Sequence, residues 1–515
     1  MSTKNILWVD DEIDSLKPHI LFLQQKGFRV DTALSGDDAL IKVREEHFDL
    51  VLLDEMMPGK DGLTTLEEIK DIRPHLPVVM VTKSEEESLM EDAVGQKIDD
   101  YLTKPVNPSQ VLMVAKRILD TKKIISESQM KRYVTDLNKI NQKLYGAMQP
   151  EDWLEAAKFL ASWDLQLDES EDEGLMQTHL GTRKELNTEF TKYLEKNYIG
   201  WLFSEDRPVL SPDLLEKYMM PLLKGGNKVL LLVIDCMRLD QWMTVEPLVS
   251  EFYNIHRDTY FSILPSATPF ARNALFAGLF PDEVDRQNPD IYKEGDEGSL
   301  NRHEDVLLEN LISRHDLKLS GNPRYEKVFN NTEGESLAKK VGNFYQSDLV
   351  AFVFNFLDIL AHGRSNNVIL KEIAGSEAAF RSLMKSWFIH SPLFSILKSF
   401  ASRDFTVIVT SDHGSVLCSR GTIAHGKRDT STNLRYKYGD NLNCEKKEAW
   451  LIKKPEDYRL PKFSLATTYL IAKEDFYFVY PNNYNEYIRQ FTNSFQHGGI
   501  SLEEMVVPVA IMTPK

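Results

Sequence analysis

Residues 229–238 read Val-Leu-Leu-Leu-Val-Ile-Asp-Cys-Met-Arg. The first six form an unbroken apolar run, and Asp235 follows it directly. Such runs are typical of strands buried on both faces of a parallel sheet, and the residue after the run lies at the carboxyl edge, where these sheets bind ligands. Apolar runs also precede Asp358 and Asp412. The three runs predict an α/β domain with a mostly parallel sheet over residues 206–515, with three carboxylates at one edge.

Histidines accompany two of these aspartates. His362 lies four residues after Asp358, His413 follows Asp412 directly, and His497 lies in a late loop bracketed by glycines. A lone aspartate after a strand is most often a helix cap or turn former, but three of them with nearby histidines favour a metal centre. Histidine and carboxylate ligands without cysteine suit Zn²⁺ or Mn²⁺ in a catalytic site that keeps open positions.

A candidate nucleophile lies between the first and second of these runs. Pro269, at a first helical turn, places Thr268 at a helix N-terminus, where backbone N–H groups stabilise anions. Taken alone, this threonine is more simply a helix cap. Beside a metal ion its hydroxyl can ionise and attack phosphorus, and Ser266 is the rival nucleophile.

A second set of carboxylates lies near the start of the chain. Short apolar runs alternate with amphipathic stretches over residues 1–122, which predicts a doubly wound parallel sheet with helices on both faces. Asp10, Asp11, Asp54 and Lys104 each follow one of its strands, so they converge at one edge. Clustered carboxylates need a hard cation such as Mg²⁺, and a carboxylate beside that cation can accept a phosphoryl group.

Composition limits the remaining possibilities. A chain of 515 residues is too long for one core, and residues 123–205, with apolar residues at helical spacing, predict a helical bundle linker between two α/β domains. The net charge of −17 argues against non-specific binding to nucleic acid or to anionic membranes. Three widely spaced cysteines form no disulfide framework and no zinc finger. With no signal-peptide pattern and no apolar run of membrane length, we expect a cytoplasmic protein without membrane insertion.

The first 120 residues resemble the receiver domain of two-component response regulators, with a CheY-like fold. The likeness is carried by the run Asp54-Glu-Met-Met-Pro58 and by the acidic and basic residues at the strand ends. It implies that Asp54 is the phosphoacceptor and that a sensor histidine kinase is the phosphodonor. It further implies that metal binding and switching depend on Asp10, Asp11, Met56, Thr82, Tyr101 and Lys104.

The last 300 or so residues resemble the alkaline phosphatase superfamily, a likeness that rests on the spacing from Thr268 to Gly278 and on the Asp-His pairs. Asp235-Cys-Met-Arg238 and His497-Gly-Gly-Ile resemble its PglZ branch. The likeness implies a two-zinc site. One ion would be held by Asp358, His362 and His497, and the other by Asp235, Thr268, Asp412 and His413.

The order of receiver, helical bundle and PglZ-like hydrolase resembles response regulators of the PorX type, which are associated with type IX secretion. This likeness implies a phosphorylation-driven homodimer and a sigma factor as a partner. No helix-turn-helix, zinc finger or other duplex-reading module is recognised in the sequence, so we do not expect direct binding to duplex DNA.

We therefore expect a response regulator whose output is a zinc-dependent phosphodiesterase acting on nucleotides or short oligonucleotides, although the motifs leave diesterase against monoesterase activity open. The alternative is a signalling scaffold whose hydrolase site senses a ligand or is vestigial. The loop around residue 425 is either a substrate-binding loop or a solvated one. The candidates for substrate contacts are the basic residues near the motifs, Arg238, Arg272, His425, Lys427 and Arg428.

Overall fold

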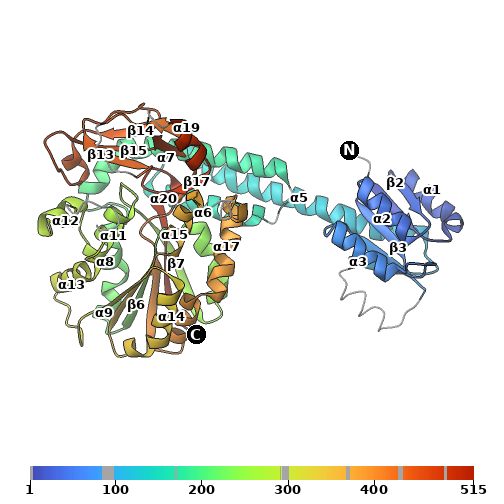
Figure 1. Ribbon diagram of the computed structural model, residues 1–515, viewed down its shortest axis with the longest axis horizontal. Helices are drawn as coiled ribbons and strands as arrows, with labels where there is room; N and C mark the ends of the chain where they lie inside the picture. The colour runs from blue at the N-terminus through green and yellow to red at the C-terminus, as the bar shows by residue number, and fades with distance from the viewer. Residues whose placement is uncertain are drawn as a thin grey trace. The chain divides into compact units, whose positions relative to one another are not determined.

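The chain forms two compact units, Met1–Thr135 and Asp136–Lys515, in the computed structural model of Figure 1. Each unit has its own sheet and core, and each is described by itself. The structure describes residues 4–83, 98–168, 170, 172–289, 291–292, 301–366, 372–426, 433–480 and 484–515.

The first unit has a five-stranded parallel sheet in the order β2-β1-β3-β4-β5. The strand order reverses beside β1, so the carboxyl ends of β1 and β3 frame the switch point where such sheets bind ligands. Every residue of β3 and β4 is buried, because helices cover both faces. This confirms the predicted doubly wound fold. The elements are β1 Asn5–Val9, η1 Ile13–Leu16, α1 Lys17–Gln25, β2 Arg29–Ala33, α2 Gly36–Glu45, β3 Leu50–Asp54, α3 Gly62–Ile72, β4 Val78–Thr82 and β5 Asp100–Thr103.

The linker is helical, as its apolar spacing predicts. Helix α5 runs unbroken over Pro108–Leu144, so the expected domain edge at residue 122 falls inside a helix. Helices α6, Pro150–Asp168, and α7, Glu173–Phe203, follow, and both belong to the second unit.

The second unit is built on a six-stranded sheet in the order β7-β18-β10-β6-β9-β8. The pairs β10–β6, β6–β9 and β9–β8 are parallel, whereas β18 runs antiparallel to both its neighbours, so the prediction of a mostly parallel sheet is confirmed. The apolar runs before Asp235, Asp358 and Asp412 form β6, β9 and β10. The strands are β6 Lys228–Ile234, β7 Tyr253–Phe261, β8 Arg324–Val328, β9 Leu349–Phe354, β10 Phe405–Thr410 and β18 Val506–Pro514.

Helices cover both faces of this sheet, with α14 and α17 on one side of it in Figure 1 and α8, α9 and α13 on the other. Apolar side chains of β6 and β9 pack with those of α10, α14, α17 and α18 into one core. Short strands that the sequence did not reveal form a small sheet above the main one, in the order β13 Tyr436–Asp440, β15 Thr467–Ala472 and β14 Ala449–Ile452. Two further pairs join β11 Val416–Cys418 to β17 Ser494–Gln496, and β12 Arg420–Ile423 to β16 Phe476–Val479. The helices of the unit's sheet domain are α8 Leu214–Tyr218, α9 Met220–Lys224, α10 Leu239–Val249, α11 Thr268–Ala277, α12 Pro281–Gln287, α13 Glu304–Arg314, α14 Asn331–Lys340, α15 Phe356–Asn366, α17 Glu377–His390, α18 Pro392–Ala401, α19 Tyr484–Phe491 and α20 Leu502–Met505.

A buried network of ion pairs joins α6 and α7 to the sheet domain. Arg183, on α7, contacts Asp164 of α6 and Glu377 of α17, and its Nε lies 3.5 Å from Glu503. Arg238 donates to the same Glu377 at 2.5 Å. These side chains are only 3–14% exposed. Buried charges are costly unless they are paired, so the network holds the linker helices and the sheet domain in one arrangement.

Acidic residues at the end of α6 and the start of α7 take part in the same contacts. Asp168 accepts two hydrogen bonds from Arg381 of α17, at 2.8 and 2.5 Å. Asp172 caps α7 by accepting from the N–H of Leu175 at 3.0 Å. At least these two carboxylates therefore have structural partners.

Replacing Glu377 by Gln should destabilise the second unit by about 3–5 kcal/mol, because Arg183 and Arg238 lose their shared carboxylate. Burial opposes ionisation of Glu377, but the charges of Arg183, Arg238 and Arg381 outweigh it and lower its pKa. The stabilisation is then present above the unfolded pKa of about 4.3 and is lost as the pH falls below it.

Thermal unfolding between about pH 7 and pH 3.5 measures this effect, and the Glu377→Gln variant should lose less stability on acidification than the wild type. Glu189→Gln is the matched control, since Glu189 pairs with Lys192 on the exposed surface and is expected to change stability by less than about 1 kcal/mol. Equal losses in the two variants would contradict the network.

Candidate metal centre and catalytic cleft

The first metal-ligand group comes from α15 and from the loop after β17, Ser494–Gln496. Asp358 and His362 lie one turn apart on α15, and the Nε2 atoms of His362 and His497 are 3.0 Å apart. Asp358 Oδ1 lies 3.2 Å from each of these nitrogens. Three ligand atoms thus converge on one point, as around a single ion.

The second group gathers at the carboxyl ends of β6 and β10. Thr268 Oγ1 lies 3.0 Å from His413 Nε2 and 3.5 Å from Asp235 Oδ1. His413 Nε2 is in turn 3.8 Å from Asp235 Oδ1 and 3.4 Å from Asp412 Oδ2. The two groups adjoin each other, because the rings of His413 and His497 stack with centroids 4.2 Å apart. The structure therefore brings together all seven residues expected to hold the two ions.

Two glycines explain how His497 reaches this position. Gly498 has φ +115°, a conformation that L side chains rarely adopt. A Cβ on Gly499 would lie 2.3 Å from the buried guanidinium of Arg435, which anchors the loop through Glu504. The two glycines thus let the loop that carries His497 pack closely against Arg435.

The electrostatics of the two groups fit cation binding. Burial, with the charges of Asp412 and Asp358, raises the pKa of Asp235 to about 8 despite the opposing charge of Arg272. Burial also lowers the pKa of His413 to about 4, so its imidazole is neutral near pH 7, the form that binds a metal. Burial opposes ionisation of Asp358, but His362 and His497 outweigh it and lower its pKa. A bound divalent cation would relieve this crowding of carboxylates.

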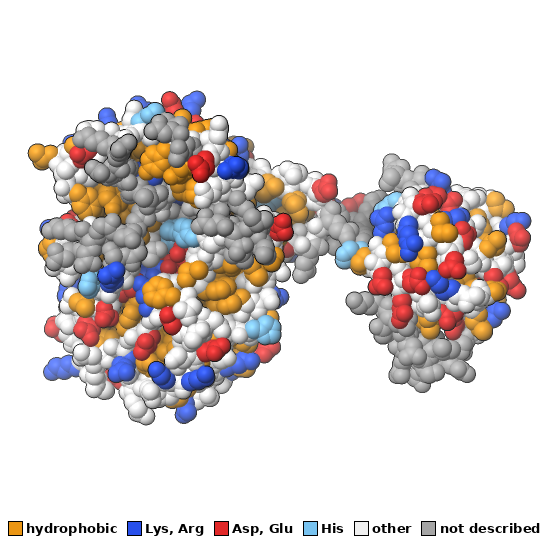
Figure 2. Space-filling model, in the orientation of Figure 1, with side chains coloured by type: hydrophobic (Ala, Val, Ile, Leu, Met, Phe, Trp, Pro, Cys, Tyr) orange, Lys and Arg blue, Asp and Glu red, His pale blue; other side chains and the backbone are white. Residues whose placement is uncertain are grey.

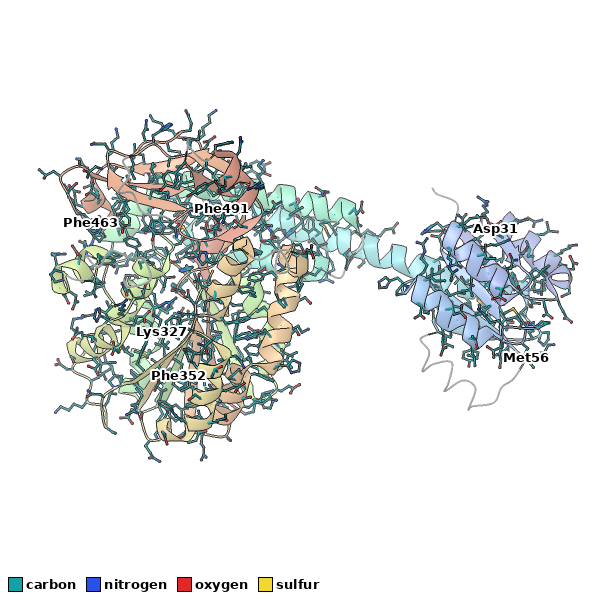
Figure 3. The ribbon with its side chains drawn as sticks, viewed as in Figure 1. Asp31, Met56, Lys327, Phe352, Phe463 and Phe491 are labelled. Atoms are coloured by element: carbon teal, nitrogen blue, oxygen red, sulfur yellow. The ribbon has the colours of Figure 1, made fainter. Side chains whose placement is uncertain are left out.

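The whole first group, together with Asp235 and Thr268 of the second, lines a cleft of about 870 Å³. Acidic, basic and histidine side chains come to the surface together in the middle of this face of the second unit (Figure 2). Lys327, on β8, and Phe491, on α19, also line the cleft and are labelled in Figure 3. The volume is that of a small-molecule pocket, roughly 300–1,000 Å³.

The structure distinguishes the two candidate nucleophiles. Helix α11 begins at Thr268 itself and its cap position is Ala267, so the Thr268 hydroxyl bonds the metal-ligand side chains instead of capping the helix. Ser266 is fully buried, donates to the carbonyl of Gly499 at 2.7 Å and is absent from the cleft lining. Thr268 is the hydroxyl that reaches the cleft.

The expected substrate contacts fare differently. The Arg238 guanidinium is buried against Asp240 and Glu377 and does not line the cleft. His425 is exposed and is not among the described residues that line the cleft. Arg272 lines the cleft but is fully buried against Asp235 and Asp412. Lys427 and Arg428 lie outside the described residues.

The first unit has its own acidic group at the switch point of its sheet. Asp10, Asp11 and Asp54 offer carboxylate oxygens that lie within 4.8 Å of one another. Lys104 Nζ lies 2.9 Å from both Asp10 Oδ2 and Asp54 Oδ2. Burial raises the pKa of Asp54, although the hydrogen bond and charge of Lys104 oppose this shift.

The expected switch residues lie around this group. The Thr82 hydroxyl donates to the carboxylate of Glu55, which follows Asp54 directly. Tyr101 and Met56 are exposed, at 43% and 66%. A phosphoryl group on Asp54 would have to draw the Thr82 hydroxyl away from Glu55 to accept its hydrogen bond.

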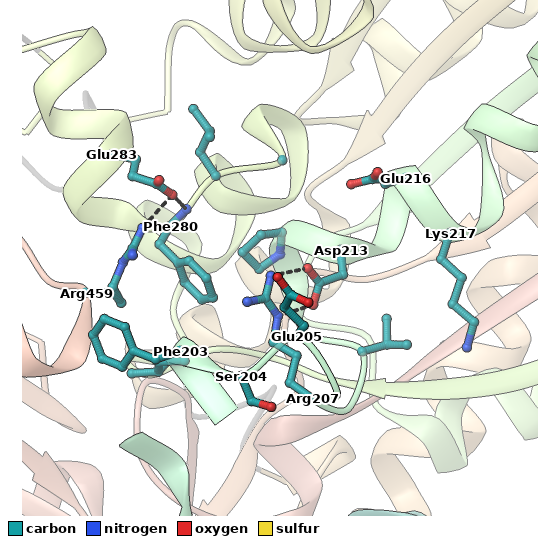
Figure 4. A pocket seen from close by; sticks show the side chains of 15 residues that line it. Phe203, Ser204, Glu205, Arg207, Asp213, Glu216, Lys217, Phe280, Glu283 and Arg459 are labelled. Carbon is teal, nitrogen blue, oxygen red and sulfur yellow. Dashed lines mark hydrogen bonds and ion pairs between the residues drawn. The ribbon is translucent and has the colours of Figure 1, made fainter. Parts of the chain in front are cut away.

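A second hollow of about 730 Å³ lies where α7 ends, beside α8 and α12 (Figure 4). Arg207 and Arg459 flank the ring of Phe280 at 5.0 and 4.9 Å, and they pair with Asp213 and Glu283. None of the metal-ligand groups found among the described residues borders this hollow.

Family comparisons agree with this geometry. The model of the BREX system PglZ alkaline phosphatase-like domain matches residues 214–512, more than half of the chain. The chain belongs to the PglZ family. The response regulator receiver domain matches residues 6–116, and the PorX response regulator linker domain matches residues 123–202. The predicted likeness to receiver, PorX-type linker and PglZ domain is confirmed, and the matches support a two-component regulator with a hydrolase-like output.

Two similar curated proteins match about a fifth of this chain. The chain is 35% identical over 114 residues to the transcriptional regulatory protein ResD of Bacillus subtilis, covering 22% of this chain and 47% of that protein. It is 39% identical over 103 residues to the transcriptional regulatory protein ZraR of Salmonella typhimurium, covering 20% and 23%. The chain thus spans half or less of the length of these two relatives. A CheY-like receiver structure from Methanospirillum hungatei is 32% identical and covers 23% of this chain and 96% of its own, with a TM-score of 0.23.

Sequence reasoning missed the polar residues behind the PglZ metal groups. Glu304 and Lys327, on α13 and β8, are bonded to each other at 2.8 Å and line the cleft. An acidic residue at a helix start is ordinary, so the sequence carried no signal for Glu304.

Within the described part of the chain, no helix is long and apolar enough to cross a membrane.

Replacing His497 by Ala should remove one ligand from the first group and leave the second group intact. We expect the PglZ domain to lose about one zinc or cobalt ion per chain, because three protein ligands become two. Metal analysis after desalting measures the loss. His425→Ala is the matched control, since this exposed histidine lies outside the cleft. Unchanged metal content in His497→Ala would contradict the assignment.

Proposed function

We propose that the protein is a response regulator whose PglZ domain is a two-zinc phosphodiesterase acting on nucleotides or short oligonucleotides. The observation that carries the proposal is the convergence of Thr268 with two adjoining metal-ligand groups in one cleft. A two-metal site of this kind clamps the attacking and leaving oxygens of an in-line displacement.

The spacing of the first group supports zinc. Ligand atoms around a tetrahedral ion with bonds of about 2.0–2.1 Å stand about 3.3 Å apart. The three separations within Asp358, His362 and His497 are 3.0, 3.2 and 3.2 Å. The second group, with separations from 3.0 to 3.8 Å, is looser but has the same kinds of ligand atom. The all-oxygen group of Asp10, Asp11 and Asp54 suits Mg²⁺ instead.

In the proposed reaction the Thr268 oxygen attacks phosphorus while the bond from phosphorus to the leaving alcohol breaks. Two bound divalent ions would lower the pKa of the Thr268 hydroxyl and neutralise the non-bridging oxygens. The N-terminus of α11 adds favourable backbone N–H groups for the phosphoryl group. Water then cleaves the phosphothreonine and restores the threonine.

The rest of the cleft supports a diester with an organic group on each side of phosphorus. Arg302 and Lys327 supply positive charge, while Phe329, Tyr487 and Phe491 supply apolar and aromatic surface. Aromatic side chains beside cations suit a nucleobase next to its phosphate. A small phosphate monoester would leave most of the 870 Å³ unfilled.

The receiver would control this output. We propose a sensor histidine kinase as donor to Asp54 and a homodimer of the phosphorylated protein, with the receiver surface changed through Thr82 and Tyr101. A role in type IX secretion and a sigma-factor partner rest on the match of the linker to PorX-type regulators. The cytoplasm, where such kinases donate their phosphoryl groups, is the proposed location.

Replacing Thr268 by Ala should abolish turnover of a chromogenic phosphodiester, by about 10⁴-fold or more, because the attacking oxygen is removed. Steady-state hydrolysis with Zn²⁺ measures the loss, and metal content shows whether the site survives. Ser266→Ala is the control, since that hydroxyl lies outside the cleft. Full turnover in the Thr268 variant would rule out its role as nucleophile.

Treatment with a small-molecule acyl phosphate and Mg²⁺ should shift the wild-type protein from monomer to dimer and change its hydrolysis rate. Asp54→Asn should prevent both changes, because the carboxylate that accepts the phosphoryl group is gone. Light scattering and the diester assay measure the two responses. Asp31→Asn, a substitution on β2 outside the acidic group (Figure 3), should behave as wild type. A monomeric wild type after confirmed phosphorylation would refute the coupling.

A further inference from the structure

A fully buried arginine stands behind the second metal-ligand group. Arg272 lies one turn after Thr268 on α11 and has no solvent exposure. Its Nη2 contacts Asp235 Oδ2, and its Nε donates to Asp412 Oδ2 at 3.0 Å. One guanidinium therefore holds two of the carboxylates that would bind the ion.

The guanidinium and the metal position use different sides of Asp235. Arg272 takes Oδ2, whereas Thr268 and His413 face Oδ1, at 3.5 and 3.8 Å. Asp412 is shared, because its Oδ2 meets both Arg272 and His413, and a carboxylate oxygen has lone pairs for both an N–H and a metal. Arg272 therefore leaves ligand atoms free for the ion that it stands behind.

Glu304 supports the far edge of this guanidinium. Its Oε1 lies 3.5 Å from Arg272 Nη1, and its Oε2 accepts from Lys327 at 2.8 Å and from Tyr325 at 2.5 Å. Glu304 is 1% exposed, so it is enclosed by these partners. Asn355 adds a fourth contact to Arg272, at 3.4 Å.

The same support reaches the backbone of the nucleophile. Lys327 donates to the carbonyl of Asn301 at 2.9 Å, and the side chain of Asn301 donates to the carbonyl of Thr268 at 3.1 Å. The segment that leads into α13 and the edge strand β8 thus hold both the carboxylates and the start of α11. Neither the segment before α13 nor strand β8 belongs to the motifs that carry the metal ligands.

We propose that Arg272 and Glu304 are a positioning pair for the second metal ion, not contacts for the substrate. The guanidinium offsets the repulsion between Asp235 and Asp412 and fixes their orientation, and Glu304 fixes the guanidinium. Arginine suits this task because its planar fork binds two carboxylates at once, which the single ammonium of lysine cannot do with the same geometry. The inference rests on the proposed two-ion site and concerns metal binding, not turnover.

Titration of metal-free full-length protein with Zn²⁺, with Mg²⁺ in excess to occupy the receiver, tests the pair. Wild-type protein should bind two zinc ions in the PglZ domain, and Asp235→Asn defines the loss of the second. Glu304→Gln should weaken the second ion by about 10–100-fold and leave the first unchanged, as for other residues that orient metal ligands. Arg272→Lys should weaken the same ion, because it keeps the charge but loses the fork.

Two further variants separate positioning from general stability. Arg459→Gln removes an arginine that is 19% exposed and pairs with Asp282 and Glu283 beside the second hollow, so it should lower stability without weakening either zinc ion. Tyr325→Phe removes one hydrogen bond to Glu304 without leaving a buried charge unpaired. It should give a smaller weakening of the second ion in a protein that still folds.

Wild-type zinc affinity in both Glu304→Gln and Tyr325→Phe would overturn the inference, as would a wild-type protein that binds only one ion in the PglZ domain. Two tightly bound ions without hydrolysis of any diester would instead refute the proposed function while leaving the positioning pair intact. Equal weakening of both ions by Glu304→Gln would also overturn it, because it would show a general loss of structure.

Discussion

Asp235 and Asp412 follow the carboxyl ends of β6 and β10 and are buried, while Asp358 lies on the first turn of α15, after β9, with 22% of its side chain exposed. The carboxyl edge of the parallel sheet thus brings the three carboxylates together, largely out of water. Like charges in a buried place repel each other, and each must be neutralised for the fold to persist. The surrounding residues divide this task. His362 and His497 face Asp358, while Arg272 and His413 face the other two carboxylates. The need to balance these three charges explains why so many polar side chains are buried beside an otherwise apolar sheet.

The helical linker takes part in the same balance of charge. Arg238 follows Asp235 by three residues, and Glu503 belongs to the segment that carries His497, so both ligand segments lead directly into the network around Arg183. Asn187, also on α7, accepts from the N–H of Leu502 at 2.7 Å and donates to Glu503. Helices α6 and α7 are therefore not a passive spacer in front of the PglZ domain. Their charged side chains hold two of the segments on which the metal ligands lie.

The sequence was sufficient for the parts of the fold that depend on local pattern. Continuous apolar runs located β6 and β10, and aspartates and histidines after such runs indicated both metal-ligand groups. The sequence was insufficient where the role of a charged side chain depends on its ion-pair partner. Arg238 and Arg272 both follow motifs at close spacing, yet one is buried outside the cleft and the other behind the carboxylates. Glu304 and Lys327 were missed because their importance depends on contacts with α11 that no local pattern encodes. The short strands β11 to β17 alternate too briefly to stand out from loops.

In both domains a basic side chain lies among the carboxylates at the strand ends, Lys104 in the receiver domain and Arg272 in the PglZ domain. The two side chains differ in their exposure to solvent. Lys104 bridges Asp10 and Asp54 with 16% of its side chain exposed, at an edge open to solvent. An incoming phosphoryl group can reach its ammonium, which has three donors and can exchange one partner for another. Arg272 has no exposed surface, and carboxylate and amide partners surround its guanidinium. Substrate could reach it only by breaking buried ion pairs, which is costly. The exposure of each cation therefore fits a different role. The partly exposed Lys104 suits contact with the phosphoryl group, whereas the buried Arg272 suits orientation of the carboxylates.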